Sequence, residues 1–205
     1  MVKTKIAVLV SGGGTNLQAL LDSQGQGILK SGEIVLVVSD NPGAFALERA
    51  RSRGVEAVVL DKAAHPARED FERSLRELIS QRGVELIVLA GFMRILSGDF
   101  TAAYDKRIIN VHPSLIPAFC GEGFYGLRVH QAVLSYGVKL TGATVHFVNE
   151  VPDGGEIILQ KAVPVRRGDT PEILQRRVME QAEWKLLPRA CELISQKLQK
   201  ERDGR

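Results

Sequence analysis

The sequence predicts an α/β protein: an open, doubly wound, mostly parallel sheet with an antiparallel strand pair toward the C-terminus. Two observations predict this fold. Apolar, β-branched runs alternate with helical patterns up to Tyr136, which is typical of β-α-β units. The runs are also nearly continuous Val, Ile and Leu, as in strands covered on both faces by helices.

Each expected element is an apolar run or a helical pattern bounded by turn residues. Strands are expected at Ile6–Val10, Ile34–Val38, Val55–Leu60, Leu86–Leu89 and Ile108–Val111. Helices are expected at Asn16–Ser23, Ala44–Arg53, Pro66–Arg82, shortly after Ser97, at Leu127–Tyr136, and from Pro171 to about Lys197. Two later strands, Gly142–Val148 and Glu156–Val165, are separated only by Asn149–Gly155. This connection is too short for a crossover helix, so the two are expected to pair antiparallel.

Length and composition indicate one globular domain. The 205 residues are 44% hydrophobic and 25% charged, enough to bury a substantial core. We expect a single domain over residues 1–205, made of two halves, residues 1–97 and 98–198, and a tail at 199–205. The apolar run near the N-terminus is only about six residues before its glycines, so it reads as a first strand and not as a signal peptide. A cytoplasmic protein without a transmembrane segment is expected.

Charge and cysteines exclude several classes of function. The formal net charge is +3, and much of the excess lies in Lys197–Arg205, which is expected to fray into solvent. No nucleic-acid or membrane partner is implied, and we expect a monomer or a homodimer. Cys120 and Cys191 lie far apart and are expected to be free thiols. A Cys120 nucleophile is conceivable, but loop packing is the simpler interpretation.

The segment from Ile108 to Ser114 carries the first chemical signal. Residues two apart in a strand share a face, so Asn110 and His112 are expected to project together just before Pro113 ends the strand. Taken alone, this is also the pattern of an ordinary strand end with a satisfied, half-buried histidine.

A glycine-rich turn follows the first strand. Ser11-Gly12-Gly13-Gly14-Thr15-Asn16 leads into a helix, where backbone N–H groups and the helix dipole favour a phosphate. The turn lacks the lysine of an ATPase loop and the third glycine of a dinucleotide-binding loop. A phosphate monoester is the best candidate, with a purely structural turn as the alternative.

Two further segments follow strands. Asp153 precedes two glycines, and its carboxylate could be held toward a neighbouring pocket, although Asp-Gly-Gly is also an ordinary hairpin turn. The segment Ala90–Leu96 is apolar where a loop is normally polar, so a flat ligand could pack there. Core packing explains it equally well.

The expected meeting of these segments at one edge of the sheet favours a functional interpretation of each over its structural alternative. Ligands of open α/β sheets bind at the carboxyl ends of the strands, where these segments are expected to meet. His112 and Asp153 would supply a proton-transfer couple and Asn110 a neutral donor for an oxyanion, which is the equipment of acyl transfer. No metal site is expected, because His65, His112, His130 and His146 lack a ligand spacing; His65 and His130 are expected on helix surfaces.

Four segments together resemble the phosphoribosylglycinamide formyltransferase family, whose members use 10-formyltetrahydrofolate. They are S-G-G-G-T-N-L-Q at 11–18, A-G-F-M-R-I-L at 90–96, N-V-H-P-S-L-I-P at 110–117 and V-H-F-V-x-x-x-x-D-G-G at 145–155. The resemblance covers nearly the whole chain, and it implies that residues 1–97 are the substrate phosphate-binding half and residues 98–198 the catalytic and folate-binding half. It implies a Rossmann-like formyltransferase fold and transfer of the formyl group of 10-formyltetrahydrofolate, a co-substrate, to the amine of glycinamide ribonucleotide in purine synthesis.

The resemblance also implies roles for individual residues. Asn110, His112 and Asp153 match the family's catalytic three. The acceptor phosphate would bind Gly13, Gly14, Thr15 and Asn16, and Glu183 would hold the ribose hydroxyls. The folate would contact Met93, Arg94, Ile95, Leu96, Val148, Asn110 and Asp153, with Arg68 near an anionic part of a ligand. The family often has His where Trp184 stands, and no role transfers to Cys120–Gly126.

Three alternatives stay open. Formyltetrahydrofolate deformylase uses the same scaffold, but it typically has N-x-H-H and an added regulatory domain. Methionyl-tRNA formyltransferase needs an added nucleic-acid-binding domain, so both are less expected in 205 residues. A non-catalytic phosphometabolite-binding module would explain the glycine turn but not the combination of Asn110, His112 and Asp153.

Overall fold

The computed structural model describes residues 2–204, which form one seven-stranded sheet of order β3-β2-β1-β4-β5-β6-β7. The strands are β1 Thr4–Val10, β2 Gly32–Ser39, β3 Glu56–Val59, β4 Leu86–Leu89, β5 Ile108–His112, β6 Leu140–Phe147 and β7 Ile157–Pro164. The first five are parallel, and β6 is antiparallel to both β5 and β7. The expected mixed sheet is confirmed.

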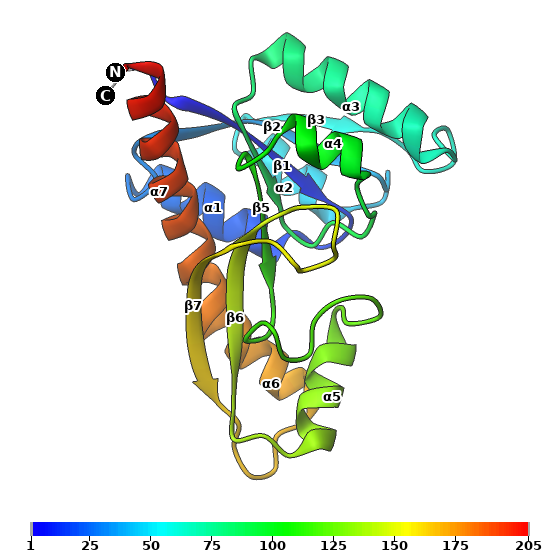
Figure 1. Ribbon diagram of the computed structural model, residues 1–205, viewed down its shortest axis with the longest axis vertical. Coiled ribbons are helices and arrows are strands. Elements are labelled where there is room, and N and C mark those ends of the chain that lie inside the picture. The colour runs from blue at the N-terminus through cyan, green and yellow to red at the C-terminus, as the bar shows by residue number, and fades with distance from the viewer. Residues whose placement is uncertain (1, 205) are drawn as a thin grey trace.

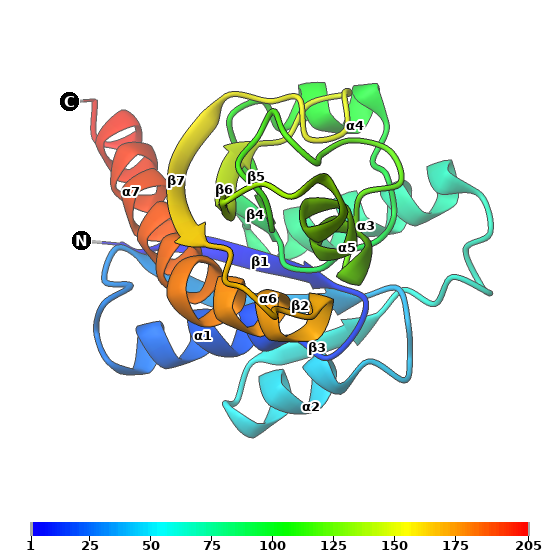
Figure 2. The same cartoon turned by 90° about the horizontal axis from the view of Figure 1, so that it is seen from below.

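Helices cover both faces of this sheet, as Figures 1 and 2 show. They are α1 Thr15–Gly25, α2 Phe45–Ser52, α3 Arg68–Arg82, α4 Gly98–Ala103, α5 Leu127–Tyr136, α6 Pro171–Val178, the π-helix η1 Met179–Glu183, and α7 Trp184–Arg202. Leucines of α1, alanines of α2 and apolar residues of α6 and α7 form the core on one face. Phe71, Leu75 and Ile79 of α3 and Phe100 of α4 form the core on the other. Continuous apolar strands are therefore buried on both sides, as their composition predicts.

Sequence signals set several helix ends. Ser97 accepts a hydrogen bond from the Phe100 amide and begins α4, and Thr170 caps α6 in the same way, with Pro171 at the first helical position. Gly83 and Gly137 end α3 and α5 in the left-handed conformation. These local signals explain why the expected helices agree with the structure to within about two residues at most ends.

The C-terminal region differs from expectation in two ways. The predicted single helix from Pro171 is interrupted by one π-helical turn, η1, before α7 continues. The predicted fraying from Lys197 is wrong, because α7 stays helical to Arg202, buries Leu198 and Gln199, and pairs Arg202 with Glu85. The end of α7 thus lies beside the start of the chain, where the Gln199 amide and the Arg202 guanidinium both donate to the Val2 carbonyl. Among the described residues, no helix is long and apolar enough to cross a membrane.

Candidate active site

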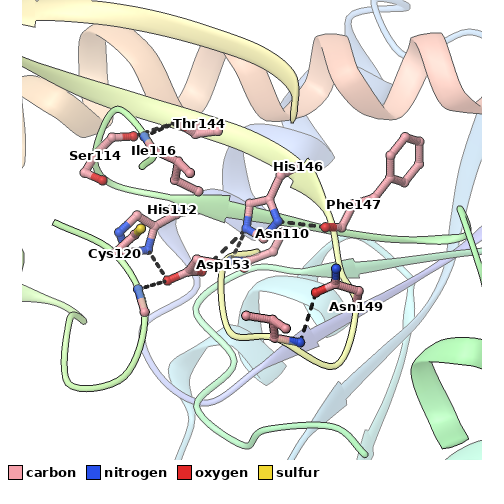
Figure 3. Close-up of polar contacts among 12 residues, drawn as sticks. Asn110, His112, Ser114, Ile116, Cys120, Thr144, His146, Phe147, Asn149 and Asp153 are labelled. Carbon is pink, nitrogen blue, oxygen red and sulfur yellow. Dashed lines mark hydrogen bonds and ion pairs between the residues drawn. The ribbon is translucent and has the colours of Figure 1, made fainter. Parts of the chain in front are cut away.

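The end of β5 presents Asn110 and His112 on the same face, as strand geometry predicts. The chain beyond them is fixed from the neighbouring strand: the Thr144 hydroxyl donates to the Ser114 carbonyl at 2.7 Å and accepts from the Ile116 amide at 3.1 Å (Figure 3). Proline at 113 cannot continue the strand ladder. The strand end is therefore held in place by β6 and turned away from the sheet.

Pairing of β5 with β6 adds a second histidine to the site. In the antiparallel register, Asn110 lies opposite His146 and His112 opposite Thr144. His146 is 1% exposed, and its Nε2 lies 3.2 Å from Asn110 Nδ2. His146 was not expected in the site, because the sequence pattern predicts pairing of β6 with β7 alone.

The connection from β6 to β7 brings Asp153 to the same point (Figure 3). The Asn149 side chain accepts from the Val151 amide at 3.0 Å, and Asp153 adopts the left-handed conformation with φ of 57°. Aspartate tolerates this region better than most non-glycine residues. A Cβ at Gly155 would lie 1.7 Å from the Phe147 carbonyl oxygen, so only glycine fits the return to β7.

Four groups surround the Asp153 carboxylate. The Gly121 amide donates to Oδ2 at 2.9 Å, and His112 Nδ1 lies 3.4 Å from the same oxygen. His146 Nε2 and Asn110 Nδ2 each lie 3.5 Å from Oδ1. Burial alone would raise the pKa of Asp153, but the contacts with His146, His112 and Gly121 outweigh it and lower the pKa. Asp153 is therefore ionised near neutral pH.

Both ring nitrogens of His112 have polar partners. Its Nε2 lies 2.9 Å from the Phe119 carbonyl oxygen and its Nδ1 faces Asp153. Burial lowers the pKa of His112, and the Asp153 charge and the Phe119 carbonyl offset this only in part. The cationic ring satisfies both acceptors while burial opposes the charge, so His112 is poised to exchange a proton. Donation to a substrate oxygen requires one of the two contacts to be given up.

A cavity of about 760 Å³ opens over this cluster. Asn110, His112 and Asp153 line one part of it, and Asn16 and Glu183 line another. A smaller pocket of about 130 Å³ shares Asn110 and Asp153 and is also lined by Leu96 and Val148. The two hollows therefore share a wall at the proposed reacting groups, which suits a reaction between two bound molecules.

The π-helical turn positions Glu183. Glu183 is 6% exposed, and its carboxylate accepts from Asn16 Nδ2 at 2.7 Å. Burial raises the pKa of Glu183 to about 7, and the hydrogen bond from Asn16 limits the rise. A single extra residue in a helix is a feature that propensities do not reveal, and such π-bulges are frequent at functional sites.

The glycine turn has two kinds of glycine. Gly14 is left-handed with φ of 71°, and a Cβ there would lie 2.6 Å from Ala46 Cβ, so this glycine permits α2 to pack against the turn. A Cβ at Gly13 meets nothing within 4 Å. Of the predicted phosphate-binding set, Asn16 lines the large cavity, whereas Gly13, Gly14 and Thr15 are not part of its lining.

Of the residues predicted to contact the folate or an anionic ligand group, some line the large cavity and one lies elsewhere. Met93, Arg94 and Ile95 line the large cavity, and Arg94 is held over Phe71 with its guanidinium donating to the His65 carbonyl. Arg68 lies at the exposed start of α3 in a separate groove, so the structure does not bring it to the cluster.

Two histidines differ from expectation. His130, predicted on a helix surface, is fully buried in α5, lines the large cavity, and has a pKa lowered by burial to about 4. His65 is half-buried in the turn before α3, where its ring contacts the Asp61 carbonyl and the Ser74 hydroxyl. The His130 prediction is wrong because an amphipathic pattern shows which face is buried only when its neighbours are known.

The assembled groups comprise an amide donor, an imidazole and an ionised carboxylate at the junction of two hollows. Residues 2–204 contain no group of three or more His, Cys, Asp or Glu side chains arranged to hold a metal ion. Both cysteines are free thiols, and Cys120 Sγ donates to the Pro117 carbonyl. Donors for an oxyanion beside a proton-transfer couple define a site suited to acyl transfer.

Comparison with known proteins agrees with this class. A family model described as formyl transferase matches residues 4–191. The chain is 42% identical over 176 residues to phosphoribosylglycinamide formyltransferase of Escherichia coli, covering 86% of this chain and 80% of that protein. It is 46% identical over 193 residues to the trifunctional purine biosynthetic protein adenosine-3 of Gallus gallus, covering 94% of this chain but 18% of that much longer protein.

Structural similarity leads to the same family. The crystal structure of glycinamide ribonucleotide transformylase 1 from Symbiobacterium toebii superimposes with a TM-score of 0.88 at 45% identity, covering 95% of this chain and 89% of that one. The chain belongs to the formyl transferase family.

Proposed function

We propose that this protein transfers the formyl group of 10-formyltetrahydrofolate to the amine of glycinamide ribonucleotide. The observation that carries the proposal is the meeting of two hollows at Asn110 and Asp153. One hollow extends to Asn16 and Glu183, beside the glycine turn, and suits a phosphorylated sugar. The other is lined by Leu96 and Val148 and suits a flat folate ring. Similar proteins that are named phosphoribosylglycinamide formyltransferase and glycinamide ribonucleotide transformylase support the same assignment.

The chemistry follows from the groups at the junction. The neutral amine attacks the formyl carbon, and the carbonyl oxygen becomes an oxyanion that Asn110 and protonated His112 stabilise. Asp153, ionised by its contacts, takes the proton that the amine loses, directly or through a water molecule. That proton passes to the folate nitrogen as its bond to the formyl carbon breaks. The acceptor amine is the nucleophile, so no covalent enzyme intermediate forms.

The acceptor would be anchored at both ends. The amides after Gly13 and Gly14 and the start of α1 would hold the phosphate, with Thr15 and Asn16, and Glu183 would accept from the ribose hydroxyls. Met93, Arg94, Ile95, Leu96 and Val148 would contact the folate, and Arg68 would meet an anionic part of a ligand only after a movement. Residues 1–97 thus supply most of the phosphate site and residues 98–198 most of the chemistry. We further propose that this single-domain enzyme works in the cytoplasm on small molecules, without a metal, as a monomer or homodimer.

Omission of the acceptor tests the proposal. With 10-formyltetrahydrofolate alone, the protein should release little formate or tetrahydrofolate; glycinamide ribonucleotide should start stoichiometric formation of the formylated ribonucleotide. Rapid formate release without acceptor would instead show a deformylase. If neither condition produced turnover while both ligands bound, the protein would be a binding module.

A further inference from the structure

His146 is a buried group beside Asn110 and Asp153 to which the proposed chemistry assigns no step. It lies directly across the β5–β6 ladder from Asn110, and its side chain is 2% exposed (Figure 3). Two polar contacts fix the ring, one to the Phe147 carbonyl and one to the Asn110 amide, and Nε2 also lies 3.5 Å from the Asp153 carboxylate. A polar ring so enclosed would cost stability unless its contacts were satisfied.

The contacts determine where His146 carries its proton. Nδ1 lies 2.8 Å from the Phe147 carbonyl oxygen, and a carbonyl only accepts, so Nδ1 carries the hydrogen. Asp153 Oδ1 lies farther from Nε2, at 3.5 Å, so Asn110 is the nearer partner of this nitrogen. In the neutral ring, Nε2 has a lone pair and accepts from Asn110 Nδ2 at 3.2 Å. The tautomer of a histidine is set in this way by the partner of its other nitrogen.

This lone pair discriminates between the two orientations of the Asn110 amide. With nitrogen toward His146, Nδ2 donates to Nε2 and lies near Asp153 Oδ1. With the amide reversed, its oxygen would face a lone pair and a carboxylate, so three acceptors would meet without a hydrogen between them. The nitrogen is also the end that an oxyanion needs, since only it can donate.

We infer that His146 is a positioning residue that, as the Nδ1-protonated neutral ring, holds the Asn110 amide with its nitrogen toward the reacting centre. This inference rests on the proposed formyl transfer for its kinetic consequence but not for its structural one. One Nδ2 hydrogen goes to His146, and the second is directed to the developing oxyanion. Asp153 lies too far, at 3.5 Å, to retain that hydrogen firmly.

A double-mutant cycle tests the kinetic consequence. His146→Phe removes the acceptor and should lower kcat roughly 10- to 100-fold, the range expected for a misplaced oxyanion donor, with both KM values within about threefold of wild type. In an Asn110→Ala background the same change should lower kcat less than about twofold, because the group it positions is gone. Equal losses in both backgrounds would overturn the inference.

Matched variants separate positioning from folding. Thr141→Val is a nearly isosteric change on the same strand, at a buried hydroxyl with no hydrogen-bond partner, and should leave kcat unchanged. His146→Gln restores an acceptor oxygen and should retain more activity than His146→Phe. If His146→Phe does not fold, a His146→Gln variant with no more activity than Asn110→Ala would also contradict the inference.

A substrate-free measurement keeps this inference distinct from the proposed reaction. Long-range ¹H–¹⁵N NMR of the wild-type protein should show the His146 proton on Nδ1 and a bare Nε2. A proton on Nε2, alone or with one on Nδ1, would overturn the assignment even in an active enzyme. Absence of turnover with the expected spectrum would instead refute the proposed function while leaving the placement of Asn110 intact.

Discussion

At the scale of single residues, the site contains two carboxylates whose pKa values are shifted in opposite directions by their surroundings. Asp153 is surrounded by donors, and its pKa is lowered even though burial alone would raise it. Glu183 is buried with one amide donor, and its pKa is raised from 4.5 to about 7. Environment thus keeps Asp153 charged, as the proposed proton transfer requires, and leaves Glu183 able to change charge near neutral pH.

The raised pKa of Glu183 predicts a pH-dependent stability. Below about pH 4.5 both the folded and the unfolded chain hold the proton; between pH 4.5 and 7 only the folded chain holds it, so its stabilising effect declines as pH rises. Relative to Glu183→Gln, the free energy of unfolding of wild type should therefore fall by roughly 1–3 kcal/mol from pH 5 to pH 8. Denaturant unfolding at the two pH values measures this difference. A difference that does not change with pH would refute the burial of an ionisable Glu183.

The contact between His112 and Asp153 predicts a coupled titration. The Asp153 charge raises the pKa of His112 against the larger effect of burial, so Asp153→Asn should lower that pKa further. NMR titration of the His112 ring proton measures the change. Asp105→Asn, which removes an exposed carboxylate outside the site, is the control and should leave the titration unchanged. An unchanged or higher pKa in Asp153→Asn would show that the two side chains do not interact.

At the scale of elements, substitutions in the glycine turn between β1 and α1 can distinguish effects on packing from effects on ligand binding. Gly13→Ala adds a methyl group that meets no protein atom within 4 Å, so the fold should be retained. If the phosphate lies on this turn, KM for the ribonucleotide should rise roughly tenfold, the cost of weakening one charge-assisted hydrogen bond, while KM for the folate changes little.

Two neighbouring glycines control that experiment. Gly12→Ala is equally free of contacts and should have the smaller effect. A substitution of Gly14 would instead disturb the packing of the turn, because its φ is positive and an added Cβ would clash with Ala46. Equal increases in KM for both substrates in Gly13→Ala would place the phosphate elsewhere.

Sequence patterns predicted these elements well where the signal was local. Continuous apolar runs identified the parallel strands, and the helices expected after Ser97 and from Pro171 begin there, where the Ser97 and Thr170 side chains cap them. The site was predictable in part: Asn110 and His112 share a strand face by geometry alone. His146 was not, because its role depends on pairing between strands about thirty residues apart, and η1 was not, because helix propensities do not reveal a single extra residue in one turn.

At the scale of the whole molecule, the antiparallel strands are what complete the active site. Five parallel strands bring the glycine turn, the 90–96 segment and the β5 end to one edge, as open α/β sheets do. Because β6 runs the opposite way beside β5, His146 lies against Asn110 and the following loop returns with Asp153. The loop after Pro117 covers the far side, where the Gly121 amide donates to Asp153 and the Phe119 carbonyl contacts His112.

This architecture predicts chemistry that depends only on protein groups and substrates. Treatment with EDTA followed by gel filtration should leave kcat and both KM values unchanged, because hydrogen-bond donors stabilise the oxyanion in the proposed reaction. Steady-state assays before and after treatment provide the comparison. Loss of activity that a divalent metal restores would contradict the proposed mechanism.

The central claim is that the side chains gathered at the end of β5 carry out the chemical step. The most direct test is a single-turnover, rapid-quench measurement on Asp153→Asn, with enzyme in excess over labelled 10-formyltetrahydrofolate and saturating glycinamide ribonucleotide. We predict that the variant binds both ligands with near wild-type affinity and transfers the formyl group roughly 10²–10⁴ times more slowly, the scale of lost proton-transfer and electrostatic groups. Transfer at the wild-type rate in a single turnover would contradict the account.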